Sequence, residues 1–235
     1  MNSKPTLFLL PGLLCDETVW HGQIEGLADT VQPRAVTYKD ARSISAMAEA
    51  VLADAPARFA VAGHSMGGRV ALEVFRQVPE RVTGLALLDS ATDGPKEGER
   101  EKRMRWVEMA RQDGMEAVVR EWLPPMVHPD RLADESLMTP LADMVRRFTA
   151  EQFAGQIEAL LTRPDATPLL SQIACPALVL CGRQDAWRAA EEHEKMAAMI
   201  PGAAFDIIEA CGHMAPIERP EDVNASLRRW LNRIA

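Results

Sequence analysis

The sequence lacks any apolar run long enough to cross a membrane or to form the core of a signal peptide. Its first five residues, MNSKP, precede an apolar run of only five residues. A membrane-spanning helix needs about 20 apolar residues, and a signal-peptide core needs about 7 to 15. We therefore expect a cytoplasmic protein with no membrane partner.

The sequence also lacks a basic stripe. Its 26 lysine and arginine residues are outnumbered by 34 aspartate and glutamate residues, which gives a formal net charge of -8, and both signs are interspersed along the chain. A protein that binds nucleic acid needs a surface that neutralises the phosphate backbone. The charge pattern therefore argues against nucleic acid as a partner.

Cysteine is scarce, and its spacing matches no metal site. The four cysteines form no CxxC pair and no Cys/His ligand pattern: Cys15, Cys175, Cys181 and Cys211. A chain of this size without an export signal keeps its thiols reduced as a rule. We therefore expect free thiols, no metal and no other cofactor.

What the chain does contain is enough apolar sequence for one substantial core. Its 235 residues are 47% apolar, and single α/β domains of this size are common. Short apolar runs alternate with longer amphipathic stretches, which is typical of a mostly parallel sheet flanked by helices. The runs predict five strands and a weaker sixth: 6–10, 59–63, 85–88, 177–181 and 205–208, with 32–38 the weaker one.

Helices are expected between these strands and in one long insertion. Proline and glycine signals bound the helical stretches, which lie at 18–28, 44–55, 68–78, 189–200 and 220–234. Residues 92–171 break the alternation, because they contain four amphipathic helical patterns and no convincing strand. We predict an α/β core formed by residues 1–91 and 172–235, with residues 92–171 inserted as a helical cap.

One motif carries the functional prediction. The apolar run that ends at Gly63 continues as Gly63-His64-Ser65-Met66-Gly67 and then enters a helical stretch. A sharp strand-to-helix turn strains the middle residue, and the flanking glycines keep side chains out of the turn. Such a turn exposes the Ser65 hydroxyl at the carboxyl end of the sheet, near the positive end of the helix. We predict Ser65 as a nucleophile, although the pentapeptide alone could be a chance match in a Gly-rich turn.

With this motif in this setting, the chain resembles the α/β-hydrolase superfamily over essentially its whole length apart from the variable cap. The resemblance implies a triad in the chain order serine, acid, histidine, with the acid after a late strand and the histidine before the last helix. Asp185 follows the strand 177–181, and His213 follows the strand 205–208. In these roles a neutral His213 accepts the serine proton, and Asp185 orients and stabilises the imidazole.

Each assignment has an alternative. Taken singly, His213 could be a loop histidine bonded to backbone, and Asp185 a turn residue that caps the next helix; their match to both expected positions favours catalysis. Asp89, directly after the strand 85–88, is the rival acid, because the acid migrates between strand ends on this scaffold. His64 is expected to pack or bond locally within the elbow. The other histidines fall on predicted surface or cap segments: His21, His128 and His193.

The oxyanion hole needs two N–H donors aimed at the tetrahedral oxygen. In the resembling family one donor belongs to the residue after the nucleophile, here Met66, and the other to the loop after the first strand. That loop places Leu13 as the donor, with Leu14 as the fallback, and Pro11 stands where the family usually has histidine. The chain also lacks the Asp-x-x-Gly-x-Gly-x-Ser stretch of many members. This weakens any link to the epoxide-hydrolase and dehalogenase branches, whose nucleophile is a carboxylate.

The expected function is that of an enzyme, a serine hydrolase that cleaves a small to medium carboxylic ester through an acyl-enzyme. The same triad serves lactones and thioesters, because all of them pass through the same tetrahedral species. A lyase or C–C bond hydrolase, related to the succinyl-cyclohexadiene carboxylate synthase of menaquinone synthesis or to ring-cleavage-product hydrolases, stays open, since fold alone does not separate them. A binding protein without chemistry is a third possibility, and the intact triad argues against it.

Substrate preference is expected to reside in the cap. Its methionine and aromatic residues suit an apolar acyl or alkyl group, although any one of them could simply pack the cap onto the sheet. Convergent arginines near the pocket would instead favour the carboxylates of the lyase substrate. The cap arginines lie in charge-rich stretches that predict solvated faces: Arg103, Arg105, Arg146 and Arg147. The pattern leaves the oligomeric state open.

Overall fold

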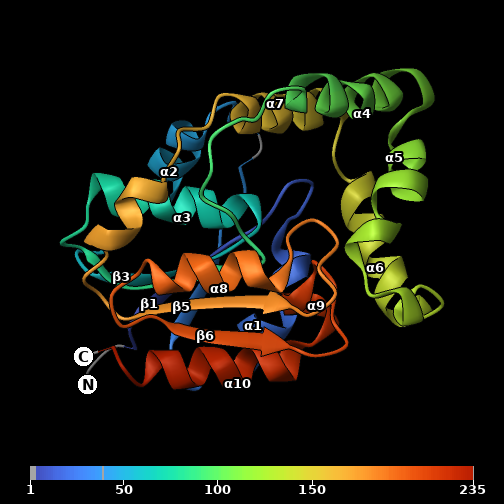
Figure 1. Ribbon diagram of the computed structural model, residues 1–235. Coiled ribbons are helices and arrows are strands. Elements are labelled where there is room, and N and C mark those ends of the chain that lie inside the picture. The colour runs from blue at the N-terminus through green and yellow to red at the C-terminus, as the bar shows by residue number, and fades with distance from the viewer. Residues whose placement is uncertain (1–3, 39, 235) are drawn as a thin grey trace.

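Six parallel strands form the centre of the molecule, as the alternating pattern predicted. The computed structural model describes residues 4–38 and 40–234 (Figure 1). The prediction of no signal peptide rests partly on residues 1–3, which lie outside this range. The strand order is β2-β1-β3-β4-β5-β6, and all neighbouring strands are parallel. The strands are β1 (Thr6–Leu10), β2 (Gln32–Ala35), β3 (Phe59–His64), β4 (Val82–Leu88), β5 (Ala177–Gly182) and β6 (Ala204–Ile208).

Burial along the strands explains why some were easy to predict. Every residue of β3 and β5 is buried, as expected for strands covered on both faces. The edge strands β2 and β6 are only partly buried. The strand expected at 32–38 ends at Ala35, since its one neighbour, β1, ends at Leu10.

Helices cover both faces of the sheet. Figure 1 shows α2, α3 and α8 on one side of the sheet and α1 and α10 on the other. The predicted helix 18–28 is divided into a 3-10 turn, η1 (Glu17–Trp20), and α1, because Trp20 departs from helical geometry with φ -105 and ψ 4. The helices are α1 (His21–Gly26), α2 (Ile44–Leu52), α3 (Met66–Gln77), α8 (Ala190–Ala198), α9 (Ala215–Glu218) and α10 (Pro220–Leu231).

The chain between β4 and β5 is helical. It contains α4 (Glu99–Asp113), α5 (Met115–Trp122), α6 (Glu135–Arg146) and α7 (Ala150–Leu161), with short 3-10 turns η2 (Pro124–Met126), η3 (Pro129–Arg131) and η4 (Thr167–Gln172). Figure 1 shows these helices arching over the end of the sheet to which the strand arrows point. No helix of the described chain is both long enough and apolar enough to cross a membrane.

Candidate active site

Ser65 occupies the turn between β3 and α3 with a backbone conformation that L-residues rarely adopt. Its φ is 53° and its ψ is -116°, a strained geometry that the surrounding contacts hold in place. A Cβ on Gly67 would lie 2.0 Å from the Leu10 carbonyl oxygen, and one on Gly63 would lie 2.2 Å from that of Gly67. The two glycines of the motif are therefore required by the close approach of backbone to backbone.

The three residues predicted as a triad lie within hydrogen-bonding distance of one another. His213 Nε2 is 2.9 Å from Ser65 Oγ, and His213 Nδ1 is 2.8 Å from Asp185 Oδ2. The other carboxylate oxygen of Asp185 accepts the N–H groups of Trp187 and Arg188 at 2.8 and 3.1 Å. Burial alone would raise the pKa of Asp185, but the adjacent His213 imidazole holds it below its usual value. Asp185 is therefore a buried carboxylate bonded to His213.

Asp89, the rival acid, points to backbone rather than to His213. Its Oδ1 accepts the N–H of Gly182 at 2.8 Å, and its Oδ2 accepts that of Ala215 at 3.2 Å. Burial, together with the charge of Asp185, raises the pKa of Asp89 well above its usual value. This side chain ties the end of β5 to the loop that carries His213.

The two remaining buried histidines lie next to the site and outside the hydrogen-bonded line of the triad. His64 Nε2 is 2.7 Å from the backbone oxygen of His213 and donates to it, so it bonds to the loop after β6, 149 residues along the chain, and not within the elbow as expected. Burial, with the nearby His213, lowers the pKa of His64 to about 3. The surface placement expected for His193 is wrong, because only 1% of it is exposed. It lies on the buried face of α8, with Nδ1 3.2 Å from the Ala189 carbonyl oxygen.

The loop after β1 packs against Ser65, and its residues Leu13 and Leu14 differ in whether their N–H groups are already bonded. Gly12 packs against the serine, because a Cβ there would lie 3.1 Å from Ser65 Cβ. The N–H of Leu14 donates to Gln156 Oε1 at 2.9 Å, whereas that of Leu13 has no acceptor within the described chain. Met66 is the first residue of α3, so its N–H has no acceptor inside the helix. Of the three predicted donors, Leu13 and Met66 thus have available N–H groups, and Leu14 does not.

A buried glutamate that the sequence analysis did not identify holds the backbone on either side of His213. Glu218 Oε1 accepts the N–H groups of Gly212 and Met214 at 3.0 and 3.2 Å. Its Oε2 accepts the N–H of His128, from the segment between β4 and β5, at 2.9 Å. No sequence motif marks Glu218, since its partners are backbone groups brought together by the fold.

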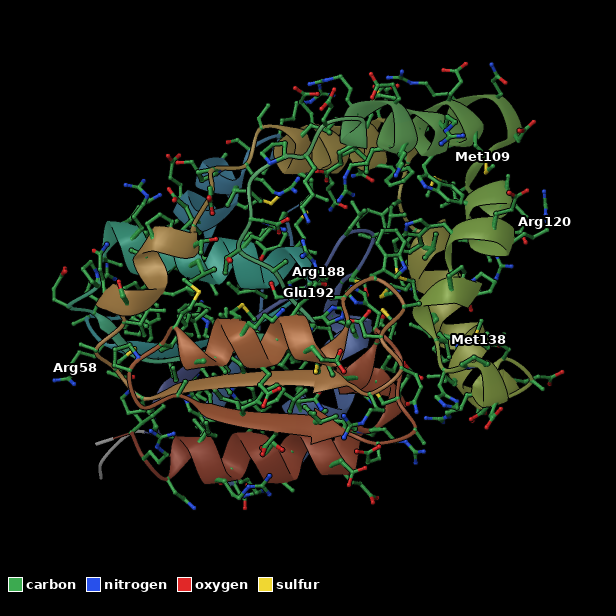
Figure 2. All side chains as sticks on the ribbon, viewed as in Figure 1. Arg58, Met109, Arg120, Met138, Arg188 and Glu192 are labelled. Atoms are coloured by element: carbon green, nitrogen blue, oxygen red, sulfur yellow. The ribbon has the colours of Figure 1, made fainter. Side chains whose placement is uncertain are left out.

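A cavity of about 310 Å³ opens beside Ser65 and His213. Its wall includes the apolar residues Leu13, Met66, Trp122, Met126 and Leu160. Met126 is the methionine of residues 92–171 among its lining residues; Figure 2 shows Met109 and Met138 on the outer part of the helical segment. The apolar lining expected from the cap is thus present on part of the wall only.

The rest of the cavity wall is charged, which the sequence analysis did not predict. Arg103, expected on a solvated face, lines the cavity with its side chain 20% exposed. It does so because its helix, α4, turns this residue toward Glu99 and away from solvent. Besides Asp89, the other charged lining residues come from the core and the helical segment: Arg69, Asp93, Lys96, Glu97, Glu99, Lys102, Arg163 and Arg188.

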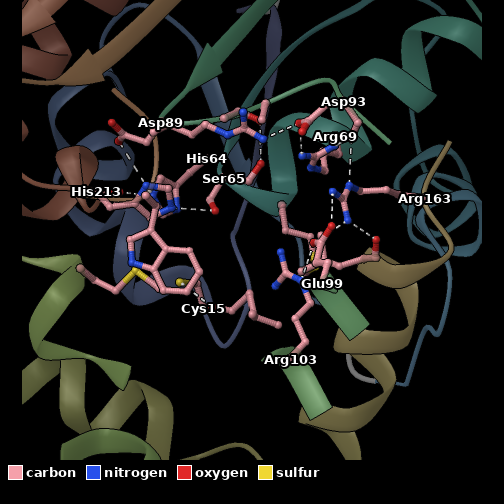
Figure 3. Close-up of a pocket in the computed structure, with 18 of the residues that line it drawn as sticks. Cys15, His64, Ser65, Arg69, Asp89, Asp93, Glu99, Arg103, Arg163 and His213 are labelled. Atoms are coloured by element: carbon pink, nitrogen blue, oxygen red, sulfur yellow. Dashed lines mark hydrogen bonds and ion pairs between the residues drawn. The ribbon is translucent and has the colours of Figure 1, made fainter. Parts of the chain in front are cut away.

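Two carboxylates organise the arginines. Glu99 accepts from Arg163 Nη1 and Nη2 at 2.8 and 2.9 Å and from Arg103 Nε at 2.7 Å (Figure 3). Asp93 accepts from Arg69 at 3.1 Å and also pairs with Arg188. Burial alone would raise the pKa of Glu99, but the arginine bonds lower it to about 2. Among residues 4–38 and 40–234, no group of three or more His, Cys, Asp or Glu side chains could hold a metal ion.

A parallel sheet with a serine, a histidine and a carboxylate at the carboxyl ends of its strands defines an enzyme of the α/β-hydrolase fold. The chain belongs to the alpha/beta hydrolase family, whose model matches residues 8–226.

Three known proteins illustrate the range of relatives. The chain is 30% identical to the 2-hydroxy-6-oxononadienedioate/2-hydroxy-6-oxononatrienedioate hydrolase of Burkholderia vietnamiensis over 73% of this chain and 61% of that protein. It is 24% identical to the 2-succinyl-6-hydroxy-2,4-cyclohexadiene-1-carboxylate synthase of Serratia proteamaculans over 97% and 93%. The solved structure of an esterase from Thermogutta terrifontis, described as malate bound, aligns with a TM-score of 0.91 at 28% identity over 99% and 91%. The relatives thus share the fold and differ in the reaction named for them.

Proposed function

We propose that this protein is a serine hydrolase in which Ser65 attacks a carboxylic ester, His213 accepts the serine proton and Asp185 holds the imidazole. The observation that supports the proposal is the unbroken line of hydrogen bonds from Ser65 Oγ through both ring nitrogens of His213 to Asp185, at 2.9 and 2.8 Å. The nucleophile also lies in a strained turn before a helix. Serine esterases of unrelated folds use the same arrangement.

The geometry supports a two-step reaction. The Nδ1–H of His213 donates to Asp185, which leaves Nε2 free to take the Ser65 proton as the serine oxygen bonds to the ester carbonyl carbon. The N–H groups of Leu13 and Met66 then stabilise the oxyanion. The tetrahedral species collapses to an acyl-enzyme, and the imidazolium returns its proton to the departing alkoxide. Water repeats the sequence, with His213 as the base, and releases the acid.

We also propose that residues 92–171 act as a cap on an α/β core of residues 1–91 and 172–235. The proposal is supported by the residues of this segment that line the same cavity as Ser65, which include Arg103, Trp122, Met126, Leu160 and Arg163. A segment that roofs the nucleophile excludes water and selects the substrate.

A second candidate is a lyase or C–C bond hydrolase that uses the same three side chains on a carboxylate-bearing substrate. The arginine-rich wall of the cavity favours it, as do the carboxylate and dioate in the names of two relatives. The esterase of similar structure is described as bound to malate, which is itself a dicarboxylate. An ester that also bears a carboxylate would suit both the arginine-rich wall and the proposed esterase reaction.

The nucleophile is tested with Ser65→Ala and a fluorophosphonate probe. The wild-type protein is expected to label once, at Ser65, and to hydrolyse short-chain esters, whereas Ser65→Ala should not label and should lose on the order of 10⁴ to 10⁶ in rate. Ser45→Ala, at an exposed position of α2, is the matched control and should behave as wild type. Labelling of Ser65→Ala would contradict the assignment. Labelling of the wild type without turnover of any ester would favour the second candidate.

A further inference from the structure

Arg103 differs from the other arginines of the cavity in the groups that it leaves unpaired. Its Nε donates to Glu99 Oε1 at 2.7 Å. Its two terminal nitrogens, Nη1 and Nη2, have no hydrogen-bond partner within the described chain. In Figure 3 the side chain leaves α4 and reaches toward Glu99 and the cavity that Ser65 lines.

The hydrogen-bonding atoms of Glu99 and Arg163, which lie next to Arg103, are already bonded to protein groups. Glu99 has both oxygens engaged, by Arg163, by Arg103 Nε and by the N–H of Lys96 at 3.0 Å. Arg163 also donates to the carbonyl oxygens of Asp93, Gly94 and Leu160. Since Arg163 has no donor to spare and Glu99 no acceptor, the terminal edge of Arg103 is the part of this group open to a ligand.

The ion-paired side chains around the cavity carry more positive than negative charge. Four arginines and one lysine form ion pairs with three carboxylates, Asp93, Glu99 and Glu192, which leaves two positive charges uncompensated. In Figure 2, Arg188 and Glu192 lie between α8 and the helices above it. Of the other charged lining residues, Lys102 and Glu97 are of opposite sign and leave the excess unchanged. Asp89, whose pKa burial raises well above its usual value, pairs with none of these cations.

The pKa values of two of these arginines, Arg69 and Arg103, are lowered by burial and in part by the neighbouring positive charges. Burial, followed by the charge of Arg163, lowers the pKa of Arg69 to about 10. Burial is also the largest cause that lowers the pKa of Arg103, and the charges of Arg163 and Arg188 act in the same direction. An anion in the cavity would relieve this repulsion.

We propose that Arg103 binds a carboxylate of the substrate through Nη1 and Nη2 while the reacting carbonyl lies at Ser65. The planar edge of a guanidinium matches the two oxygens of a carboxylate, and Glu99 already orients the group through Nε. The substrate class is therefore an acyl compound with a second, free carboxylate, such as a monoester of a dicarboxylic acid. The inference rests on the proposed function, because it places the reacting group at Ser65, and it replaces the uncharged acyl group expected from the sequence.

The test compares esters that differ only in the distant carboxylate. The monomethyl esters of succinic, glutaric and adipic acid are set beside methyl butyrate, valerate and hexanoate, which have the same chain lengths. Arg103→Gln should lower kcat/KM for the best monomethyl ester by about ten- to hundredfold, the effect of losing a charge-assisted bidentate pair. It should change the uncharged esters by less than about threefold. Arg103→Lys keeps the positive charge and loses the two parallel N–H donors of the guanidinium, so its kcat/KM for the monomethyl esters should lie between those of the wild type and Arg103→Gln.

Arg105→Gln is the matched control, because Arg105 lies on the same helix, is exposed and lines no part of the cavity. It should leave both ester series unchanged. The melting temperature of each variant separates loss of binding from loss of fold. An equal fall for charged and uncharged esters in Arg103→Gln and Arg103→Lys, or no fall in either, would overturn the proposal.

A binding measurement separates this inference from the proposed function. Calorimetric titration of Ser65→Ala with monomethyl glutarate is expected to give saturable binding that the double variant with Arg103→Gln loses. If Ser65→Ala still hydrolyses ester, the assignment of Ser65 as the nucleophile is wrong. The titration with glutarate then still tests the carboxylate site. If neither monomethyl glutarate nor glutarate binds to Ser65→Ala, the carboxylate site is wrong whatever the reaction.

Discussion

Two buried aspartates lie close to His213, and their partners assign them different roles. Asp185 bonds the imidazole at 2.8 Å, and that interaction lowers its pKa despite burial. Asp89 bonds two backbone N–H groups, with His64 Nε2 4.0 Å from its Oδ2, and burial raises its pKa well above the usual value. At the residue scale, a carboxylate that keeps its charge beside the imidazole can stabilise an imidazolium, whereas one that burial drives toward the neutral form is suited to holding backbone.

Asp185→Asn is therefore expected to lower kcat by about 10⁴ with little change in KM, because the amide favours the wrong tautomer of His213 without altering the cavity. Asp89→Asn should lower kcat far less. It should instead reduce the free energy of unfolding by about 1 to 3 kcal/mol, since its amide group can face one of the two backbone N–H donors. Steady-state kinetics and urea unfolding of both variants check this. The reverse ranking of kcat would transfer the acid role to Asp89.

At the scale of elements, the loop between β6 and α9 is held by groups from α9 and from the helical segment between β4 and β5. Glu218 of α9 bonds the backbone on both sides of His213 and reaches His128 of the helical segment. The N–H of His213 donates to the Met126 carbonyl oxygen at 2.8 Å. The position of the imidazole thus depends on the short helix α9 and on the segment that covers the cavity.

Glu218→Gln should loosen this loop, because an amide can satisfy only some of the three N–H donors that the carboxylate accepts. We expect a fall in kcat of about tenfold with KM changed less than about twofold, and slower labelling by the fluorophosphonate. Glu221→Gln, at an exposed position in the first turn of α10, is the control and should leave all three unchanged. A lower melting temperature in Glu218→Gln with unchanged kcat would show that Glu218 supports the fold without positioning His213.

At the scale of the whole molecule, partly buried ion pairs make the stability depend on pH. The pKa of Glu99 falls from 4.5 to about 2 in the folded protein, and that of Asp93 is lowered below 3.8 because the bonds from Arg188 and Lys96 outweigh burial. A carboxyl whose folded pKa is depressed contributes stability above its unfolded pKa and loses it as the pH falls toward its folded pKa. The free energy of unfolding should therefore decrease as the pH falls from about 4.5 toward about 2.

Glu99→Gln should remove part of this dependence. It is expected to lower the free energy of unfolding by about 2 to 3 kcal/mol near neutral pH, because Arg103 and Arg163 lose their shared carboxylate. Its unfolding curve should then change less between about pH 5 and about pH 2 than that of the wild type. Glu80→Gln, at an exposed position outside the cavity, serves as the control in urea denaturation over this range. A parallel pH dependence in all three proteins would contradict the contribution of Glu99.

Much of the fold and the line of Ser65, Asp185 and His213 followed from the sequence alone. The reason is that each depends on a short window: apolar runs mark buried strands, and a G-x-S-x-G turn between a strand and a helix has one backbone solution. The ends of parallel strands then meet at one edge of the sheet, so residues that follow β3, β5 and β6 are brought together by topology.

The character of the cavity was decided only by tertiary structure. Leu13 rather than Leu14 has an available N–H group because the N–H of Leu14 donates to Gln156, 142 residues further along the chain. The orientation of Arg103 depends on Glu99, whose oxygens are also engaged by Arg163, 64 residues away. Ion pairing between distant segments leaves no periodic pattern in either segment. The sequence of a charge-rich helix therefore predicts a solvated face even where another segment buries it. Local backbone constraints can therefore be predicted from the sequence, whereas the electrostatics of a site assembled across the chain arise only when the chain is folded.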